Sequence, residues 1–423
     1  MIENIKETRL RNGLVILTDQ MPGVRSVTLG FFFRTGSRNE PRDLNGITHF
    51  IEHAVFKGTK RRSALDIAVE QDRLGGSLEA FTTHEEMALA IKVTDDQLGS
   101  AFDLVTDMLS DPQFDEKEMQ SEQKVVIEEL KMSDDVPEDR LGDLFSRAFY
   151  LDHPLGMSIA GTPKTVRTFD HTVARKFYKR LFFPGNMIVV AAGNIVHEDF
   201  VKLVRRKFKF NGPRARALRK TRLPKPAAPI LIKQNKTLEQ SHLILATPMV
   251  SGRDKRRYAA DLLAQIVGGG TSSRLWQKIR EERGLAYSVG ASTIMFNDSG
   301  MFIVSAGTSP TQTLEVLDIT IAEMREIVAS GVGAEELDLA KQQTRASVLL
   351  SLEDSASRAA SLAQSEILHG RQISVEESLE NVDAVTLDDV HSLAKEFFRT
   401  EKIGFAALGN LNGLKVNRKR LAI

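Results

Sequence analysis

The sequence predicts two similar domains, each built from strands and helices, and three observations lead to this prediction. The 423 residues are more than one ordinary hydrophobic core accommodates. A stretch rich in proline and basic residues interrupts the chain at residues 211–229. Beyond this stretch the predicted elements recur in their earlier order, which indicates an old internal duplication.

The first half alternates predicted strands and helices. The Asn12-Gly13 dipeptide is typical of a β-hairpin turn. Helices are predicted for residues 43–56 and 115–132, the second with Asp115 as its N-cap. Runs of apolar, often β-branched residues predict strands at residues 26–34, 78–81, 88–93 and 187–192.

The interruption at residues 211–229 carries four prolines among six arginines and lysines. We interpret it as an interdomain linker at residues 213–232, between a domain at 1–212 and a second at 233–423. A basic surface for nucleic acid or membrane is the alternative, but no aromatic residues are interspersed.

The second half repeats features of the first. A strand is predicted at residues 241–246 and a helix at 258–267, and residues 405–410 resemble 190–194. The H-x-x-E-H motif described below has no counterpart here. A glycine-rich segment at 268–275 stands in its place, and it lacks the G-x-x-x-x-G-K-[ST] pattern of phosphate-binding loops. We therefore predict a helix-ending turn there.

Composition excludes several classes of protein. The hydrophobic content of 42%, the charged content of 27% and the net charge of +1 are ordinary for a globular enzyme and argue against a nucleic-acid binder. The absence of cysteine excludes disulfides and thiolate ligands, so a metal site must use His, Asp or Glu. The first residues lack the apolar core of a signal peptide, and no uncharged run reaches the length of a membrane span. A cytoplasmic enzyme is the expectation.

Residues 49–53 read His-Phe-Ile-Glu-His, an H-x-x-E-H motif. Two histidines four residues apart lie on one helical face and can bind a single ion. Glu52 is three residues from His49 and borders the same face. Such a set suits metal-assisted hydrolysis, in which imidazoles hold zinc and a carboxylate takes a proton from water. The order is that of the inverted zinc-peptidase motif.

Two other interpretations of the motif stay open. The first is a polar helix face with two solvated histidines, but the neighbouring side chains are apolar and predict a buried helix, in which imidazoles need partners. The second is a metal-binding module without hydrolysis. Glu52 favours hydrolysis, because a plain binding site needs no base.

A catalytic zinc site needs a third protein ligand and leaves one position for water. The helix predicted at 115–132 offers the glutamates Glu116, Glu118, Glu122, Glu128 and Glu129. Helical phasing puts Glu122 and Glu129 along one border of its apolar stripe and Glu128 on the opposite side. The first two can therefore face a core site. Without the histidines, two border carboxylates on an exposed helix would be the simpler interpretation.

Several stretches resemble the superfamily of pitrilysin, insulysin and the mitochondrial processing peptidase. They are GITHFIEHAVFKGT from Gly46, LGGSLEAFTTHEE from Leu74, SEQKVVIEELK from Ser121, AAGNI from Ala191 and GGGTSSRLWQKIREERGLAYSVGA from Gly268. The resemblance covers essentially the whole chain and favours the processing-peptidase-like branch. It implies an α+β fold of two similar domains, each an antiparallel sheet with helices packed on it.

The resemblance also implies roles for the candidate residues. His49, His53 and Glu129 match the ligands of one zinc ion per chain, with seventy-five residues between His53 and Glu129. Glu52 matches the general base. Glu122 matches a carboxylate that supports the ligands from behind.

Substrate-binding residues are implied in both halves. Arg280 and Tyr287 match an Arg and a Tyr, seven apart, that bind substrate and the developing oxyanion. The edge strand that pairs with substrate matches Glu79, Ala80, Phe81 and Thr82. Many relatives have Asn at the position of Glu79, so this residue either favours a basic residue in the peptide or is a tolerated variant.

The predicted function is a zinc-dependent endopeptidase that hydrolyses peptides or unfolded segments in an enclosed chamber formed by a homodimer. One alternative is a non-catalytic structural subunit, against which the intact zinc motif argues. Another is one half of an obligate heterodimeric processing peptidase. The presence of both the zinc motif and the Arg/Tyr pair on one chain argues against it. Manganese or cobalt in place of zinc stays possible.

Overall fold

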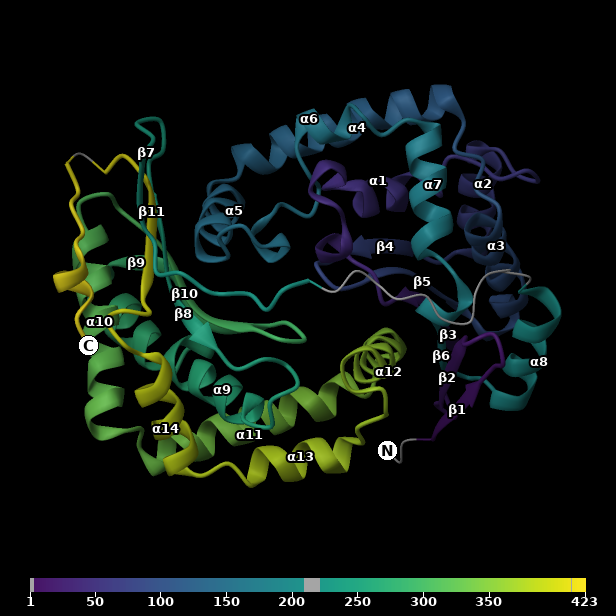
Figure 1. The fold of residues 1–423 in the computed structure, drawn as a ribbon. Helices are drawn as coiled ribbons and strands as arrows, with labels where there is room; N and C mark the ends of the chain where they lie inside the picture. The colour runs from purple at the N-terminus through teal and green to yellow at the C-terminus, as the bar shows by residue number, and fades with distance from the viewer. Residues whose placement is uncertain (1–3, 209–220, 412) are drawn as a thin grey trace. The chain divides into compact units, whose positions relative to one another are not determined.

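The computed structural model describes residues 4–208, 221–411 and 413–423, which form two compact units (Figure 1). Unit 1 comprises Met1–Met132, Met157–Thr221 and Leu349–Ser374, and unit 2 comprises Ser133–Gly156, Arg222–Val348 and Val375–Ile423. Each unit contains segments from both halves of the sequence. The limits of 1–212 and 233–423 stay a prediction about how the chain divides into folding domains.

Of the predicted linker at 213–232, residues 213–220 lie outside the described part of the chain. Its last three residues belong to a strand, β7 (Ile230–Gln234). The apolar run Ile230-Leu231-Ile232 explains this, because such residues pair in a sheet rather than remain in a solvated linker.

Unit 1 is built on a six-stranded sheet in the order β1-β2-β6-β3-β5-β4. All neighbours are antiparallel except β2 and β6, which are parallel. Gly13, at φ +92°, lies in the predicted hairpin turn between the first two strands. The four strands predicted for this half are confirmed to within one residue. The bounds are β1 (Ile5–Arg9), β2 (Val15–Gln20), β3 (Ser26–Phe33), β4 (Leu78–Thr82), β5 (Met87–Thr94) and β6 (Met187–Gly193).

Unit 2 is built on a five-stranded sheet in the order β7-β11-β8-β10-β9. Only β7 and β11 are parallel. Without β1, the sheet of unit 1 has the same order and its parallel pair at the same place, which supports the predicted duplication. The remaining bounds are β8 (Ser241–Met249), β9 (Ala286–Met295), β10 (Gly300–Thr308) and β11 (Gly404–Gly409).

The α+β fold with two similar sheets is confirmed, with one difference in detail. Each sheet is antiparallel apart from one parallel pair, which the prediction of an antiparallel sheet does not include. Parallel pairing requires a long crossover connection, and the many helices between β2 and β6 and between β7 and β11 provide one.

Helices surround both sheets. Those of unit 1 are α1 (Ile47–Ala54), α2 (Ala64–Leu74), α3 (Leu98–Ser110), most of α4 (Glu116–Asp135), α6 (Pro163–Val166), α7 (His171–Leu181), α8 (His197–Lys207) and α12 (Ser355–His369). Those of unit 2 are α5 (Pro137–Phe149), α9 (Arg257–Ala264), α10 (Thr313–Ser330), most of α11 (Ala334–Ser351), α13 (Val375–Asp383) and α14 (Leu387–Phe397). Among the described residues, no helix has the length and apolarity that a membrane span requires.

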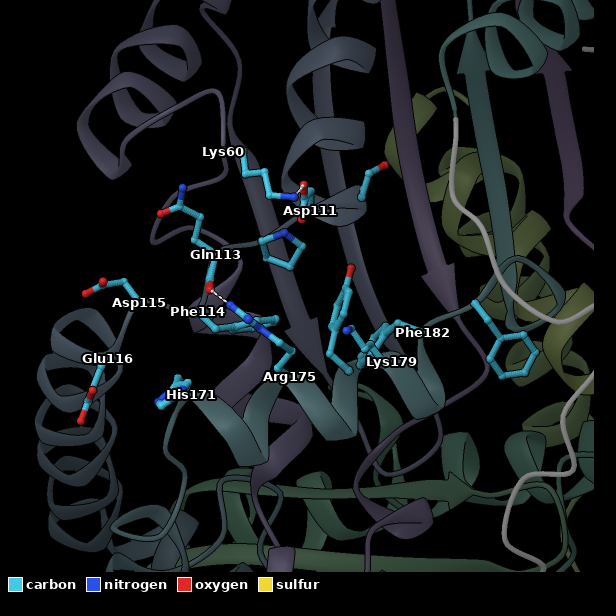
Figure 2. A pocket seen from close by; sticks show the side chains of 14 residues that line it. Lys60, Asp111, Gln113, Phe114, Asp115, Glu116, His171, Arg175, Lys179 and Phe182 are labelled. Atoms are coloured by element: carbon cyan, nitrogen blue, oxygen red, sulfur yellow. Dashed lines mark hydrogen bonds and ion pairs between the residues drawn. The ribbon is translucent and has the colours of Figure 1, made fainter.

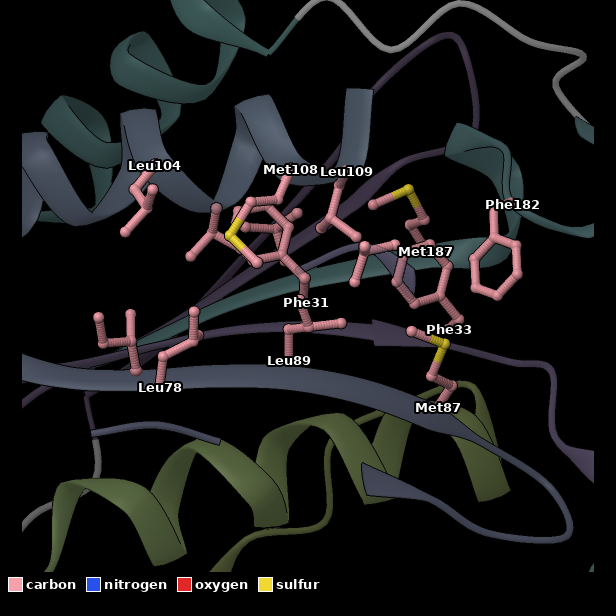
Figure 3. Packing of buried hydrophobic residues seen from close by; sticks show 14 of the residues in the cluster. Phe31, Phe33, Leu78, Met87, Leu89, Leu104, Met108, Leu109, Phe182 and Met187 are labelled. Carbon is pink, nitrogen blue, oxygen red and sulfur yellow. The ribbon is translucent and has the colours of Figure 1, made fainter. Parts of the chain in front are cut away.

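The sheet of unit 1 is buried on both faces. Phe31 and Leu89 pack against Leu104 and Met108 of α3 on one face (Figure 3). On the other face, strand residues pack against Ala359, Leu362 and Ala363 of α12. Double-sided burial explains why β3 and β6 are almost continuously apolar. Unit 2 uses α5 in the same way, against β8 and β11.

A buried ion pair joins α12 to the sheet, and its removal is expected to destabilise unit 1. Arg358 donates to Asp19 Oδ2 at 2.5 Å, and both side chains are 3% exposed. Burial raises the pKa of Asp19, an effect that the charge of Arg358 opposes. Arg358→Met should therefore cost about 3–5 kcal/mol of unfolding free energy, measured by denaturant titration, because the Asp19 charge loses its partner. Arg25→Met is the control. Arg25 pairs with Asp95 while 81% exposed, so its loss should leave the free energy of unfolding nearly unchanged.

Candidate metal centre

The histidine motif lies on α1, which is shorter than predicted. The helix spans Ile47–Ala54, whereas residues 43–56 were expected to be helical. Gly46, immediately before it, has φ +95°, and a Cβ there would lie 2.6 Å from the carbonyl oxygen of Ala160. This left-handed backbone cannot continue a helix, so α1 begins after Gly46. Its apolar residues are buried, as the flanking sequence predicted.

Glu40 caps the beginning of α1 from a preceding loop. Its Oε2 accepts from the Gly46 N–H at 2.7 Å, and its Oε1 accepts from the Thr48 N–H at 2.8 Å. Gly46 offers no capping side chain, so Glu40 supplies the acceptors that the first helical N–H groups need. Burial raises the pKa of Glu40 to about 7, against the effect of these hydrogen bonds.

The structure brings His49, His53 and Glu129 together. One ligand atom from each lies within 4.8 Å of the others. His49 Nε2 is 3.8 Å from Glu129 Oε1, and His53 Nε2 is 3.5 Å from Glu129 Oε2. The histidine side chains are 13% and 23% exposed and that of Glu129 is 49% exposed, so the cluster opens to solvent on the glutamate side.

These residues fit a zinc ion. Ligands held at about 2.0–2.1 Å in a tetrahedron lie about 3.4 Å apart, close to the separations of Glu129 from the two imidazoles. The donor set of two nitrogens and one carboxylate leaves one position open, as in hydrolytic zinc sites. Burial and the neighbouring His53 lower the pKa of His49 to about 4, so its imidazole is neutral and able to bind metal.

Glu122 contacts the ring nitrogen of His53 that faces away from Glu129. His53 Nδ1 lies 2.9 Å from Glu122 Oε1, and Lys57 Nζ lies 2.7 Å from Glu122 Oε2. Burial alone would raise the pKa of Glu122, but the hydrogen bonds from His53 and Lys57 outweigh it and lower that pKa. A charged Glu122 accepts a hydrogen bond from the Nδ1–H of His53. The other ring nitrogen, Nε2, is then free of a proton and faces the cluster.

Glu52 is tied to the edge strand of the sheet. Thr82, the last residue of β4, donates from Oγ1 to Glu52 Oε2 at 2.5 Å. Burial raises the pKa of Glu52, against the effect of this hydrogen bond. Among the described residues, β4 pairs only with β5, so its outer edge is open beside Glu52. Along β4, Glu79 and Phe81 are exposed, while Leu78 and Ala80 pack toward the core.

The glutamates of α4 divide as their phasing predicted. Glu122 is buried and Glu129 faces the histidines, whereas Glu128 pairs with Lys131 at 2.7 Å and is 66% exposed. Asp115 accepts from the Lys117 N–H at 2.9 Å, which confirms its place before the helix. The helix itself extends three residues beyond the predicted end, to Asp135.

Arg280 and Tyr287 belong to unit 2, whereas the histidine cluster belongs to unit 1. The two lie close together within their own unit, with Arg280 Cζ 5.1 Å from the centroid of the Tyr287 ring. The Tyr287 residue is 80% exposed. The predicted helix-ending turn nearby is confirmed, since the helical segment after α9 ends at Gly269.

A cavity of about 730 Å³ lies elsewhere in unit 1 and is not the candidate site (Figure 2). None of its lining residues belongs to the histidine cluster. Two of its cations already have partners: Lys60 pairs with Asp111 at 2.6 Å, and Arg175 donates to the Gln113 carbonyl oxygen at 2.6 Å. The converging metal ligands therefore identify the site better than this cavity does.

Glu40, Lys57 and the Thr82 hydroxyl join the site without having been predicted in these roles. Lys57 carried a local signal, because it follows His53 by four residues, one turn further on. Glu40 carried none, since a loop glutamate that caps a helix resembles any surface glutamate in sequence.

Loss of the Glu40 cap is expected to weaken metal binding. Glu40→Ala should reduce zinc affinity by about tenfold, measured by competition with a chelating dye, because the beginning of α1 loses the acceptors that hold His49 in place. Glu40→Gln keeps an acceptor oxygen and should be milder. An unchanged affinity in Glu40→Ala would show that the packing of α1 alone fixes the histidines.

Sequence comparisons place the chain among known proteins. Residues 15–163 match the insulinase family, peptidase family M16, and residues 168–344 match the peptidase M16 inactive domain. An uncharacterized zinc protease of Streptomyces coelicolor is 38% identical over 93% of this chain and 87% of its own length. The uncharacterized zinc protease YmxG of Bacillus subtilis is 37% identical over 96% of this chain and 98% of its own.

Solved structures share the fold. A protease from Helicobacter pylori superposes with a TM-score of 0.89 at 21% identity, over 97% of this chain and 100% of that one. A peptidase M16 inactive domain from Pseudomonas fluorescens also gives 0.89, at 19% identity, over 96% of this chain and 98% of the other. With both halves matched by its family and relatives aligned along nearly its whole length, the chain belongs to peptidase family M16, within the pitrilysin superfamily.

Proposed function

We propose that the chain is a zinc-dependent endopeptidase in which Glu52 is the general base. The observation that carries this proposal is the convergence of His49, His53 and Glu129 on α1 and α4. Glu52 lies on the same helix as the two histidines and is not needed as a ligand. A site that only stored metal would have no use for Glu52 at this position. The zinc-protease names of the relatives support the same class of reaction.

Each residue of the site has a distinct task. One zinc ion per chain, held by the two histidines and Glu129, would supply a water of lowered pKa and polarise the substrate carbonyl. Glu52 takes a proton from the attacking water and later gives it to the leaving amine. Thr82 holds the carboxylate in place, and Glu122 orients His53. Because burial raises the pKa of Glu52, this carboxylate is a stronger proton acceptor than an exposed glutamate.

The open edge of β4 is the proposed binding surface for substrate. A peptide that adds there as a further strand would pair through its backbone and lie beside Glu52. The exposed side chains of Glu79 and Phe81 would contact alternate residues of the peptide. Glu79 favours a basic residue at its position, whereas Ala80 and Thr82 contribute backbone groups.

The assay that tests the function uses the purified full-length chain alone. Zinc content should approach one per chain, and a quenched peptide library should be cleaved. Chelation should abolish cleavage and added zinc should restore it. Recovery with manganese or cobalt alone would show that the assignment of zinc is wrong. Zinc binding without cleavage would instead favour a structural subunit or a chain that needs a different partner. Light scattering tests the proposed homodimer in the same preparation.

Tyr287 is proposed to donate to the developing oxyanion, with Arg280 beside it. Tyr287→Phe should lower turnover by about 10²–10³ while zinc content stays unchanged, because one oxyanion donor is lost. Tyr258→Phe is the matched control, since this tyrosine of α9 accepts from Arg257 at 2.6 Å and has no proposed role in catalysis. Equal activity of both variants would remove Tyr287 from the mechanism.

A further inference from the structure

Arg280 lies over two aromatic rings of unit 2. Its Cζ is 4.1 Å from the centroid of the Trp276 ring and 5.1 Å from that of Tyr287. Both distances are within the range of cation–π attraction. A long arginine side chain otherwise samples many rotamers, so contact with two rings restricts where its guanidinium lies.

The guanidinium of Arg280 keeps its N–H groups available. Within the described part of the chain it makes no hydrogen bond, and its nearest carboxylate contact is Glu281 Oε1, 4.0 Å from Nε. Its side chain is 32% exposed. The aromatic rings stabilise the positive charge without accepting hydrogen bonds from the guanidinium N–H groups. These N–H groups can therefore still bind a carbonyl or carboxylate oxygen.

Trp276 is itself held firmly. Its Nε1–H donates to Glu281 Oε1 at 2.9 Å, and its ring packs against the core of unit 2. Trp276 to Glu281 form a π-helical turn, a feature that often marks functional sites. Arg280 follows Trp276 by four residues and folds back over its ring. The chain then turns at Gly284, φ +60°, and places Tyr287 at the start of β9.

We propose that Trp276 is a positioning residue that, together with Tyr287, holds the Arg280 guanidinium ready for an oxygen atom of a peptide substrate. We call the three side chains of Trp276, Arg280 and Tyr287 the aromatic clamp. The clamp is a property of unit 2 alone, and its use on peptides rests on the proposed function.

The clamp can be tested without any substrate, because Trp276 is the only tryptophan of the chain. Arg280→Met in the full-length protein should change the tryptophan emission spectrum, since the cation over the ring is removed. Arg283→Met is the control, as Arg283 is 52% exposed and pairs with Glu315. An emission spectrum unaltered by Arg280→Met would overturn the clamp.

Kinetics test the positioning role. Trp276→Leu should lower kcat/KM about 3- to 30-fold with zinc content unchanged, whereas Trp276→Phe, which keeps a ring face, should retain most activity. In the Arg280→Met background, Trp276→Leu should cause no further loss, because it acts only through Arg280. Additive losses, or full activity of Trp276→Leu, would overturn the role.

Two further readouts keep the outcomes distinct. Melting curves identify a Trp276→Leu variant that does not fold, in which case Trp276→Phe and the Arg280→Met emission decide. A wild-type chain that cleaves no peptide would overturn the proposed function and the use of the clamp on peptides. The emission experiment would still decide whether the clamp exists.

Discussion

Glu52→Gln should keep its zinc and lose hydrolysis by about 10³–10⁴, near the upper end of what a general base contributes. The amide has nearly the shape of the carboxylate and can still accept from Thr82, whose hydroxyl lies 2.5 Å from Glu52 Oε2. The metal ligands are not altered. What the variant lacks is a group that can take a proton from water. Elemental analysis and the quenched-peptide assay measure the two properties separately.

Glu70→Gln is the control for Glu52→Gln, because Glu70 lies on α2 of the same unit and pairs with Arg62 instead of lining the site. It should leave both zinc and turnover unchanged. Loss of metal from Glu52→Gln would show that this residue holds the ion or the helix. Full activity would show that another group removes the proton.

Part of the candidate metal cluster was predictable from local sequence information. His49 and His53 are brought together by helical periodicity alone, and the phasing of α4 separates Glu129 from Glu128 without any knowledge of the fold. Local information does not show that α1 and α4 lie side by side in the fold. That expectation rested on the family resemblance, in which seventy-five residues separate the positions of His53 and Glu129.

Contacts between segments distant in the sequence were not predictable. Thr82 reaches Glu52 only because β4 folds against α1, although the two residues are far apart in the sequence. Glu40 lies close in sequence to Gly46, but its capping role depends on the loop conformation between them, which the sequence does not reveal. The reason given for Thr82 also applies to α12, which comes from the second half of the sequence and covers the sheet of unit 1. An amphipathic helix shows in its sequence that it has an apolar face, but not which sheet that face will cover.

Glu129→Gln should lose most of its zinc, whereas Glu128→Gln should not. Glu129 places one carboxylate oxygen 3.8 Å from His49 Nε2 and the other 3.5 Å from His53 Nε2, so its charge completes the donor set. Glu128, one residue earlier, pairs with Lys131 and faces solvent. Two histidines without a carboxylate form an incomplete site, so hydrolysis should fall together with metal content.

The comparison of neighbouring glutamates separates geometry from general charge effects. Both substitutions remove one negative charge from the same turn of α4 and barely change side-chain volume, so folding and long-range electrostatics should be alike in the two variants. Zinc affinity, measured by competition with a chelating dye, should then differ through ligation alone. Equal losses would mean that α4 attracts the ion through its overall charge, and the assignment of Glu129 as third ligand would be wrong. If Glu129→Gln alone loses hydrolysis and excess zinc partly restores it, the missing carboxylate contributed zinc affinity. Glu52 would then still be able to act as the base.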